Sequence, residues 1–431
     1  MTLRTLRTGL AGATAIVVFG GAVLAAPPAV ATEKADAAEK ALATGTAHAA
    51  GKAVIPGKAH ATGIAPTAGK ALAAGRALAA GKDHAKTGAA MAAAVRAGVP
   101  GVLAGTLDSH GIWRATAGVG DLRTHKPRGT GDSFRIGSVT KSFTSTVLLQ
   151  LEAEGRLSLE DTVDHWLPGQ VRGHGHDGRK ITLRQLLNQT SGIADFVQSA
   201  EFTRKYIGAG FLKHRYDSWT PRQVLRLAMG QRPVFAPGTS WGYSNTNYIL
   251  AGMVIKKVTG HSYTTEVQRR ILRPLGLTST KLPGDSPRMT GRHGHAYSKL
   301  LLKDPAAKVY DTTELNPSWG SSAGEMISTT RDLNRFYRAV LGGRLLPRPQ
   351  LKEMLTTVPT SKETPRLRYG LGLQHRTLSC GTQVYGHGGG IHGSETMAAV
   401  TRDGRHAASF NLNSDWVGDL EALLEAEFCG K

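Results

Sequence analysis

The stretch RIGSVTKSF, residues 135–143, puts a serine and a lysine three positions apart at the beginning of a segment with helical periodicity. Apolar residues recur at helical spacing from Val139 to Leu151, so we expect a helix that starts near Ser138. Either Ser138 caps this helix, since serine is a favoured N-cap residue, or it is a nucleophile whose base is Lys141, one helical turn further along. A Ser-x-x-Lys pair also arises by chance, so this pair alone is a weak signal.

Two other short motifs carry residues with catalytic chemistry. WGYSNTNY, residues 241–248, places Tyr243 and Asn245 two positions apart just before a helical pattern. VYGHGGG, residues 384–390, places His387 before a run of glycines at the end of a strand pattern. Taken singly, each motif has an ordinary structural explanation, because Asn245 suits an N-cap and His387 with its glycines suits a turn.

In this order, the three motifs resemble those of the penicillin-recognising serine acyl-transferases: class C β-lactamases, related esterases and serine D-Ala-D-Ala carboxypeptidases. The family pattern is Ser-x-x-Lys, then Tyr-x-Asn, then Lys- or His-x-Gly. Segments such as ITLRQLLNQTSGI and FAPGTSWGYSNTNYILAG also look like family sequence, so the resemblance covers roughly residues 90–431. The exocellular carboxypeptidase/transpeptidase subgroup is the most similar, since it shares the third-motif histidine and the segments LSCGT (378–382) and FCGK (428–431).

The resemblance implies an acyl-enzyme formed on Ser138. Lys141 would take the proton of Ser138, provided that burial lowers the pKa of its ammonium. Tyr243 would face the same hydroxyl, as a phenolate-like base or as a shuttle that passes the proton to the leaving amine. His387 would supply a positive field and help to hold Tyr243 in its reactive form. We therefore expect these four residues to be catalytic.

The resemblance also implies the groups that hold the substrate. Asn245 would donate a hydrogen bond to the substrate's amide carbonyl, and the amides of Ser138 and Gly390 would form the oxyanion hole. Gly389, like its neighbouring glycines, would let the backbone approach the ligand closely. Trp319 is expected to line the site, with a core role as the alternative. Arg376 is expected to serve the substrate carboxylate from a shifted place, or not at all.

The chain departs from the carboxypeptidase subgroup at the third motif. Gly388 and Gly390 stand where that subgroup has threonines, so two hydroxyls that would grip a terminal carboxylate are missing. We expect a D-Ala-D-Ala carboxypeptidase or transpeptidase that acts on peptidoglycan stem peptides or related D-amino-acid peptides and is acylated by β-lactams. An esterase or D-amino-acid amidase of the same fold, and a β-lactam-binding envelope protein without turnover, stay open as alternatives. No metal or other cofactor is expected, and we expect a monomer.

A hydrolase of a different fold is a further alternative. GSSAG, residues 320–324, matches the Gly-x-Ser-x-Gly nucleophile elbow, and HGGG, residues 387–390, matches an esterase oxyanion motif. Their order is reversed relative to α/β-hydrolases, and the segment before GSSAG contains a proline and no apolar run. This alternative is therefore disfavoured.

The N-terminal region predicts export. Arg4 and Arg7 precede an apolar stretch that ends in Ala29-Val30-Ala31, which is the layout of a secretory signal peptide, so we expect residues 1–31 to be removed by cleavage near Ala31 and the protein to be secreted. Residues 32–86 are rich in Ala, Gly and Lys and read as a disordered linker. The net charge of +21 suggests adhesion to polyanions, but no zinc-finger spacing, arginine-rich stripe or aromatic platform points to nucleic acid.

Two cysteines and the distribution of strand patterns bear on the fold. Cys380 and Cys429 are the only cysteines, and in an exported chain we expect them to form a disulfide. Strand patterns occur early and late in the chain, with helical patterns between. We therefore expect an α/β sheet domain from residues 87–155 and 315–431 with a mostly helical domain, 156–314, inserted. The resemblance implies a β-lactamase/transpeptidase-like fold, α/β (α+β), whose mainly antiparallel sheet is flanked by helices.

Overall fold

The structure, a computed structural model, describes residues 84–430. The expected signal peptide, and the expected linker up to residue 83, lie outside the described residues. The first helix, α1 (Ala85–Arg96), starts two residues before the expected beginning of the globular sequence at residue 87. Within 84–430, every helix is too short or too polar to cross a membrane.

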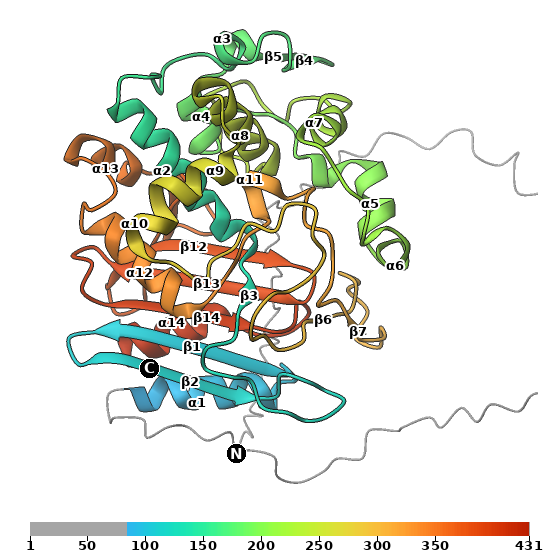
Figure 1. The fold of residues 1–431 in the computed structure, drawn as a ribbon, viewed down its shortest axis with the longest axis vertical. Coiled ribbons are helices and arrows are strands. Elements are labelled where there is room, and N and C mark those ends of the chain that lie inside the picture. Colours follow the sequence, from blue (N-terminus) through green and yellow to red (C-terminus); the bar gives the residue numbers. More distant parts are fainter. Residues whose placement is uncertain (1–83, 431) are drawn as a thin grey trace, which may run out of the picture. The chain divides into compact units, whose positions relative to one another are not determined.

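An eight-stranded antiparallel sheet contains strands from both ends of the described chain (Figure 1). Strand β1 near the N-terminal end pairs with β14 near the C-terminal end, with Ala104 opposite Phe410. This pairing of distant segments explains why strand patterns appear early and late in the sequence. In spatial order the strands are β2 (Gly111–Gly118), β1 (Gly101–Asp108), β14 (Ala407–Leu412), β13 (Ser394–Thr401), β12 (Gln383–Ile391), β11 (Gln374–Thr377), β10 (Leu367–Tyr369) and β9 (Val358–Pro359).

Helices cover both faces of this sheet (Figure 1). On one face, α1 and α14 (Leu420–Cys429) close a small apolar core that contains Met91, Phe410 and Leu424. On the other face, α12 (Thr330–Leu341) and α2 (Thr140–Ala153) belong to a larger core that continues into the helical region. Both faces of the sheet are covered at β1, and successive side chains of a strand point to opposite faces. Side chains of both orientations are therefore buried in β1, and its sequence reads as a continuous apolar run rather than an alternating one.

The segment between the early and late strands is mostly helical. Its longest helix, α8 (Asn245–Thr259), ends at Gly260, whose left-handed backbone conformation suits glycine. The other helices are α3 (Val163–Trp166), α4 (Leu183–Leu187), α5 (Ala200–Tyr206), α6 (Gly210–His214), α7 (Pro221–Met229), α9 (Tyr263–Val267), α10 (Arg273–Leu275), α11 (Ser321–Gly324) and α13 (Arg348–Leu355). Three short strand pairs complete the fold: β3 (Phe134–Arg135) with β8 (Ile327–Ser328), β4 (Arg172–Gly173) with β5 (His176–Asp177), and β6 (Tyr297–Ser298) with β7 (Tyr310–Asp311).

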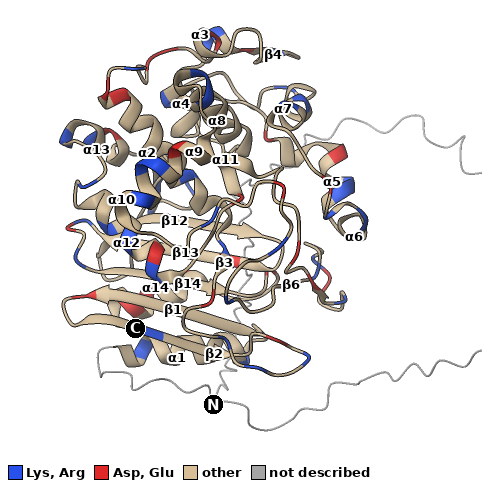
Figure 2. Cartoon of the chain, in the orientation of Figure 1, with Lys and Arg blue, Asp and Glu red and all other residues tan. Residues whose placement is uncertain are grey.

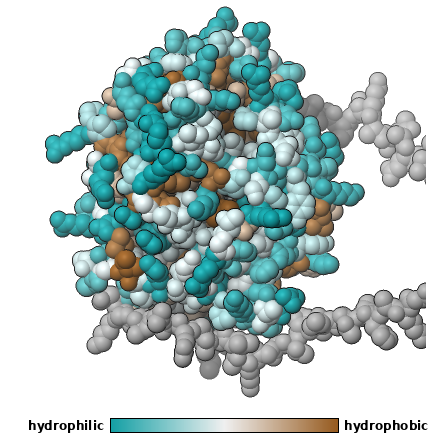
Figure 3. Space-filling view, in the orientation of Figure 1, coloured by the Kyte–Doolittle hydropathy of each residue, from teal (hydrophilic) through white to brown (hydrophobic). Residues whose placement is uncertain are grey.

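The predicted architecture is confirmed: helices flank a large, antiparallel sheet. The division into a sheet domain and an inserted helical domain stays a prediction. In the view of Figure 2, lysine and arginine positions are spread over several helices rather than gathered in one stripe. The same face is largely hydrophilic, with scattered apolar patches (Figure 3).

The predicted disulfide is confirmed, since Cys380 and Cys429 are bonded and close a loop with a sequence separation of 49. It joins the end of α14 to the turn between β11 and β12, on the sheet face away from α2. Replacing both cysteines by alanine is expected to lower the free energy of unfolding by about 4 kcal/mol, because the unfolded chain regains the entropy of that loop. Urea denaturation of the variant and the parent protein measures this difference, and equal midpoints with equal slopes would contradict it.

Candidate active site

Ser138 lies in a single 3₁₀ turn, Gly137–Val139, that runs directly into α2. Neither helical segment has a side-chain cap at its start, so the capping interpretation of Ser138 is wrong. Instead, the Ser138 Oγ accepts a hydrogen bond of 2.9 Å from the Nζ of Lys141, one turn further along. Ser138 is partly exposed and Lys141 is buried, which is the geometry of a reachable nucleophile with a desolvated base behind it.

Strand β12 packs against this turn so closely that only glycine fits. A Cβ atom on Gly389 would lie 2.0 Å from the carbonyl oxygen of Ile136 and 2.8 Å from the Ser138 amide nitrogen. A Cβ atom on Gly137 would lie 2.8 Å from the Gly390 nitrogen, at a positive φ of 49°. The glycines expected to permit a close approach therefore do so, and they bring the amides of residues 138 and 390 to the same place.

The edge of β12 beside Ser138 is open. Strand β11 pairs with β12 only as far as Gly386, so residues 387–391 have β13 on one side and no strand from residues 84–430 on the other. The Gly388 amide points to that open edge, where it donates a 3.0 Å hydrogen bond to Gln374 Oε1. Because alternate amides of a strand point the same way, the Gly390 N–H also faces this edge. The amides of Ser138 and Gly390 can thus form the expected oxyanion hole.

Lys141 is held by three acceptors. In addition to Ser138 Oγ, its Nζ donates to Asn245 Oδ1 at 2.7 Å and to the carbonyl of Ala323 at 2.8 Å. Burial lowers the pKa of Lys141 to about 7, and the carboxylate of Asp195 opposes this shift. A substantial fraction of Lys141 is therefore neutral near neutral pH and able to accept the Ser138 proton, as its predicted role as the base requires.

Asp195 was not predicted to belong to the site. Its Oδ2 accepts a 2.9 Å hydrogen bond from Asn245 Nδ2, so Asn245 connects this carboxylate to Lys141. Burial raises the pKa of Asp195 to about 6. Asp195 follows TSGIA in the loop after α4, and no pattern in that loop signals its contact with a residue 50 positions later. An amide carries two N–H donors, so Asn245 keeps one for the substrate carbonyl.

Replacing Asp195 by asparagine is expected to move the acidic limb of the kcat/KM–pH profile to lower pH. The carboxylate favours the charged form of Lys141, so its removal lets the lysine lose its proton at a lower pH. Asparagine retains an oxygen that can accept from Asn245. The measurement is kcat/KM against pH for the variant, the parent and the surface control Asp403→Asn, and a limb displaced to higher pH would contradict the assignment.

The ring of Tyr243 lies beside the base, with Lys141 Nζ 4.9 Å from its centroid. Burial raises the pKa of the Tyr243 hydroxyl well above its usual value, and its interaction with Ser138 opposes this shift. The hydroxyl is therefore protonated in the resting site. This favours the proton shuttle over the phenolate-like base among the two roles expected for Tyr243.

His387 is buried behind Tyr243, and its Nε2 shares a 2.8 Å hydrogen bond with the hydroxyl of Tyr369. Burial and the neighbouring Lys141 lower the pKa of His387 to about 3, so its ring is neutral. The expected positive field from His387 is therefore wrong for this site. The packing part of its expected role agrees with the geometry, because the His387 and Tyr243 rings lie 6.4 Å apart, centroid to centroid.

Two of the expected substrate-binding residues have other partners. Trp319 is buried and packs against Phe202 and Tyr206, with centroid distances of 5.3 and 5.7 Å, which agrees with its alternative core role. Arg376 donates to Gln374 Oε1 at 2.6 Å and to a carboxylate of α14, that of Glu421, at 3.1 Å. The Arg376 guanidinium thus donates hydrogen bonds to two side chains of the protein itself.

The elbow motif GSSAG does not present a nucleophile. Ser322 is buried, and its hydroxyl donates to the carbonyl of Tyr248 at 2.8 Å. The motif forms the short helix α11, which supplies the Ala323 carbonyl to Lys141. Across residues 84–430, the structure contains no group of three His, Cys, Asp or Glu side chains arranged to hold a metal ion.

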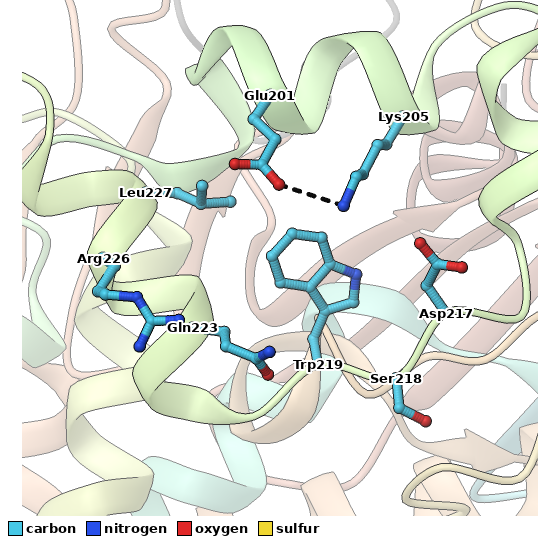
Figure 4. Close-up of a pocket in the computed structure, with 8 residues that line it drawn as sticks. All are labelled: Glu201, Lys205, Asp217, Ser218, Trp219, Gln223, Arg226 and Leu227. Carbon is cyan, nitrogen blue, oxygen red and sulfur yellow. Dashed lines mark ion pairs between the residues drawn. The ribbon is translucent and has the colours of Figure 1, made fainter.

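A separate pocket of about 510 Å³ lies between α5 and α7 (Figure 4). The Trp219 ring lies in it with the Lys205 ammonium 4.7 Å from the ring centroid, and Lys205 pairs with Glu201 at 3.1 Å. The Trp219 Nε1 donates to Tyr206, the tyrosine that packs on Trp319. None of the residues predicted for the site lines this pocket.

Solved structures share this fold and parts of the sequence. A D-stereospecific amidohydrolase from Streptomyces sp. is 55% identical, with a TM-score of 0.78 over 81% of this chain and 99% of the other. A D-amino acid amidase from Ochrobactrum anthropi SV3, solved with L-phenylalanine amide, is 28% identical, with a TM-score of 0.68 over 79% of this chain and 97% of the other.

Among curated proteins, penicillin-binding protein 4* of Bacillus subtilis is 26% identical over 330 residues, which are 73% of this chain and 68% of the relative. The comparisons do not support the expected monomer, which stays a prediction. A family model described as Beta-lactamase matches residues 36–422, which include the serine–lysine pair, the Tyr-x-Asn motif and the glycine-rich edge strand. The chain is therefore a member of the serine β-lactamase and penicillin-binding protein family, and a serine hydrolase.

Proposed function

We propose that the protein is a D-stereospecific amidohydrolase that cleaves amides and esters of D-amino acids through an acyl-enzyme on Ser138. The observation that carries this choice over a carboxypeptidase is the engagement of Arg376 by Gln374 and Glu421, next to a third motif that lacks hydroxyl side chains. A terminal carboxylate needs a cation or several donors to replace its water. An amide or ester has no such requirement.

The proposed reaction starts with neutral Lys141. It accepts the proton of Ser138 while the Oγ attacks the carbonyl carbon, and the two amides of residues 138 and 390 hold the oxyanion. Lys141 returns the proton, with Tyr243 as the shuttle, to the nitrogen of the leaving amine as the C–N bond breaks. Water then attacks the ester by the same route and releases the D-amino acid. Asn245 orients both Lys141 and the substrate carbonyl.

Similarity supports the choice of substrate class. The Streptomyces sp. enzyme is named a D-stereospecific amidohydrolase, and its similarity to this chain extends over 99% of its length. The curated penicillin-binding relative favours the second candidate, a D-Ala-D-Ala carboxypeptidase or transpeptidase acting on peptidoglycan stem peptides, with acylation by β-lactams. For either activity we propose a secreted enzyme, on the strength of the N-terminal sequence.

Hydrolysis of D-phenylalaninamide, L-phenylalaninamide and a D-Ala-D-Ala-terminated peptide tests the proposal. We expect kcat/KM for the D-amide to exceed that for the L-amide by about 100-fold and to exceed that for the peptide. Faster cleavage of the peptide would overturn the amidohydrolase in favour of the carboxypeptidase. Intact-mass spectrometry after incubation with benzylpenicillin identifies the third case, an acylated protein that turns over none of these three substrates.

A further inference from the structure

Strand β12 has a second face, turned away from the Ser138 turn. Side chains alternate along a strand, so positions 388 and 390 face opposite to Gly389, which packs on that turn. A Cβ atom on Gly388 would lie 3.3 Å from the methyl group of Met397, and one on Gly390 would lie 3.0 Å from Glu395 Oε1. Glu395 stands directly opposite Gly390 in the β12–β13 register. A carboxyl group therefore lies directly beside the oxyanion strand.

This carboxyl group is incompletely satisfied. The Oε1 of Glu395 is buried and has no hydrogen-bond partner among the described residues. Asp415 is 3% exposed, and its Oδ1 is equally without a partner in that part of the chain, while its Oδ2 accepts from the Gly393 amide at 2.8 Å. Burial raises the pKa of Glu395 well above its ordinary value, and Asp415 adds to the shift. A buried polar atom without a partner is costly, and a ligand group is one explanation for its presence.

A cation would complete this arrangement. An ammonium placed beside Glu395 would supply the missing donor and would favour the ionised carboxylate. A carboxylate placed there would lose its water beside another carboxyl group, and the nearby cation Arg376 already donates to Gln374 and Glu421. A ligand group beside Glu395 should therefore be positively charged, whereas a carboxypeptidase needs a site for the negatively charged terminal carboxylate of its substrate.

The location of Glu395 relative to the scissile carbonyl indicates which part of the substrate Glu395 would contact. The Gly390 amide holds the oxyanion, so the scissile carbon lies within a few bonds of Gly390 and the leaving group starts at that carbon. The residues at positions 388 and 390 are also those whose hydroxyls, in the carboxypeptidase pattern, would grip the terminal carboxylate of the leaving residue. The resemblance at positions 388 and 390 therefore implies that Glu395 lies on the leaving-group side.

We propose that Glu395, with Asp415 behind it, forms an amine subsite that favours leaving groups carrying an ammonium over those carrying a carboxylate. The proposal rests on the amidohydrolase function above and names its leaving-group preference. In each turnover the amide C–N bond breaks, the Ser138 ester forms, and the departing nitrogen receives the proton that Ser138 gave up. The distant ammonium keeps its charge throughout.

Three substrates with the same D-phenylalanyl donor test the subsite. Their leaving amines are glycine, glycinamide and ethylenediamine, which present a carboxylate, a neutral amide and an ammonium in nearly the same place. We expect the parent enzyme to prefer the ammonium to the carboxylate by more than about tenfold in kcat/KM, and Glu395→Gln to reduce the ammonium-to-neutral ratio by about tenfold. Glu363→Gln, on the exposed loop before β10, should leave all three ratios unchanged.

The outcomes separate the subsite from the function. If the parent enzyme hydrolyses none of the three substrates, the proposed function fails and the subsite fails with it. If it hydrolyses them with no preference for the ammonium, the function stands and the subsite is overturned, even where Glu395→Gln does not fold. An ammonium preference that persists unchanged in folded Glu395→Gln also overturns the assignment to Glu395.

Discussion

Replacing Ser138 by alanine is expected to lower kcat for D-phenylalaninamide by a factor on the order of 10⁶, which is the loss typical of removing the nucleophile of a serine hydrolase. The fold should survive, because Ser138 is partly exposed and its hydroxyl accepts one hydrogen bond, from Lys141. Rapid-quench kinetics and intact-mass spectrometry measure the loss. The parent protein should gain the mass of the acyl group, and Ser138→Ala should not.

The matched control is Ser322→Ala, which removes the serine of the GSSAG elbow. Its hydroxyl is buried against the Tyr248 carbonyl, so this variant should still form the acyl-enzyme on Ser138. Retained acylation in Ser138→Ala together with its loss in Ser322→Ala would reverse the assignment of the nucleophile. If both variants lost acylation while both kept native circular dichroism spectra, neither serine would be the sole reacting group. That result would contradict the proposed mechanism.

Replacing Lys141 by arginine is expected to reduce the rate of acylation by about 10⁴-fold, near the upper end of what a general base contributes. The guanidinium stays protonated at every accessible pH, so it cannot take the Ser138 proton. The native lysine, with a pKa of about 7, can do so once the pH passes that value. In the parent protein kcat/KM should therefore rise with pH through about 7, and this limb should be absent from Lys141→Arg.

Stopped-flow acylation with a D-phenylalanine ester, followed from pH 5 to pH 9, makes this comparison. Lys256→Arg, at an exposed position of α8, is the control for the same change of side chain away from the site. A rate within about tenfold of the parent for Lys141→Arg would show that another group activates Ser138, since a general base contributes at least about 10²-fold.

The residues of the candidate active site were largely predictable from short motifs. Ser138 and Lys141 lie one turn apart in sequence, and a helix necessarily puts residues at that spacing on one side. Tyr243, Asn245 and Gly390 were placed by resemblance, and each lies in the neighbourhood expected for it. The disulfide was predictable because only two cysteines exist.

Other properties were not predictable, because they depend on burial and on contacts between distant segments. The charge expected on His387 was wrong, since a ring buried beside Lys141 loses its proton more readily than an exposed one. Asp195 joins the site only through Asn245, and Arg376 is diverted by a glutamate on the last helix. No local pattern records such pairings.

The sequence by itself determined the family, the candidate nucleophile with its candidate base, the cysteine pair and the presence of strands at both ends, because these depend on residue identity and short-range spacing. Only the tertiary structure decided which groups are charged and which donors are free. Desolvation and cross-strand register set the state of Lys141, His387 and Glu395, and both exist only once β12, α2 and α8 have packed together.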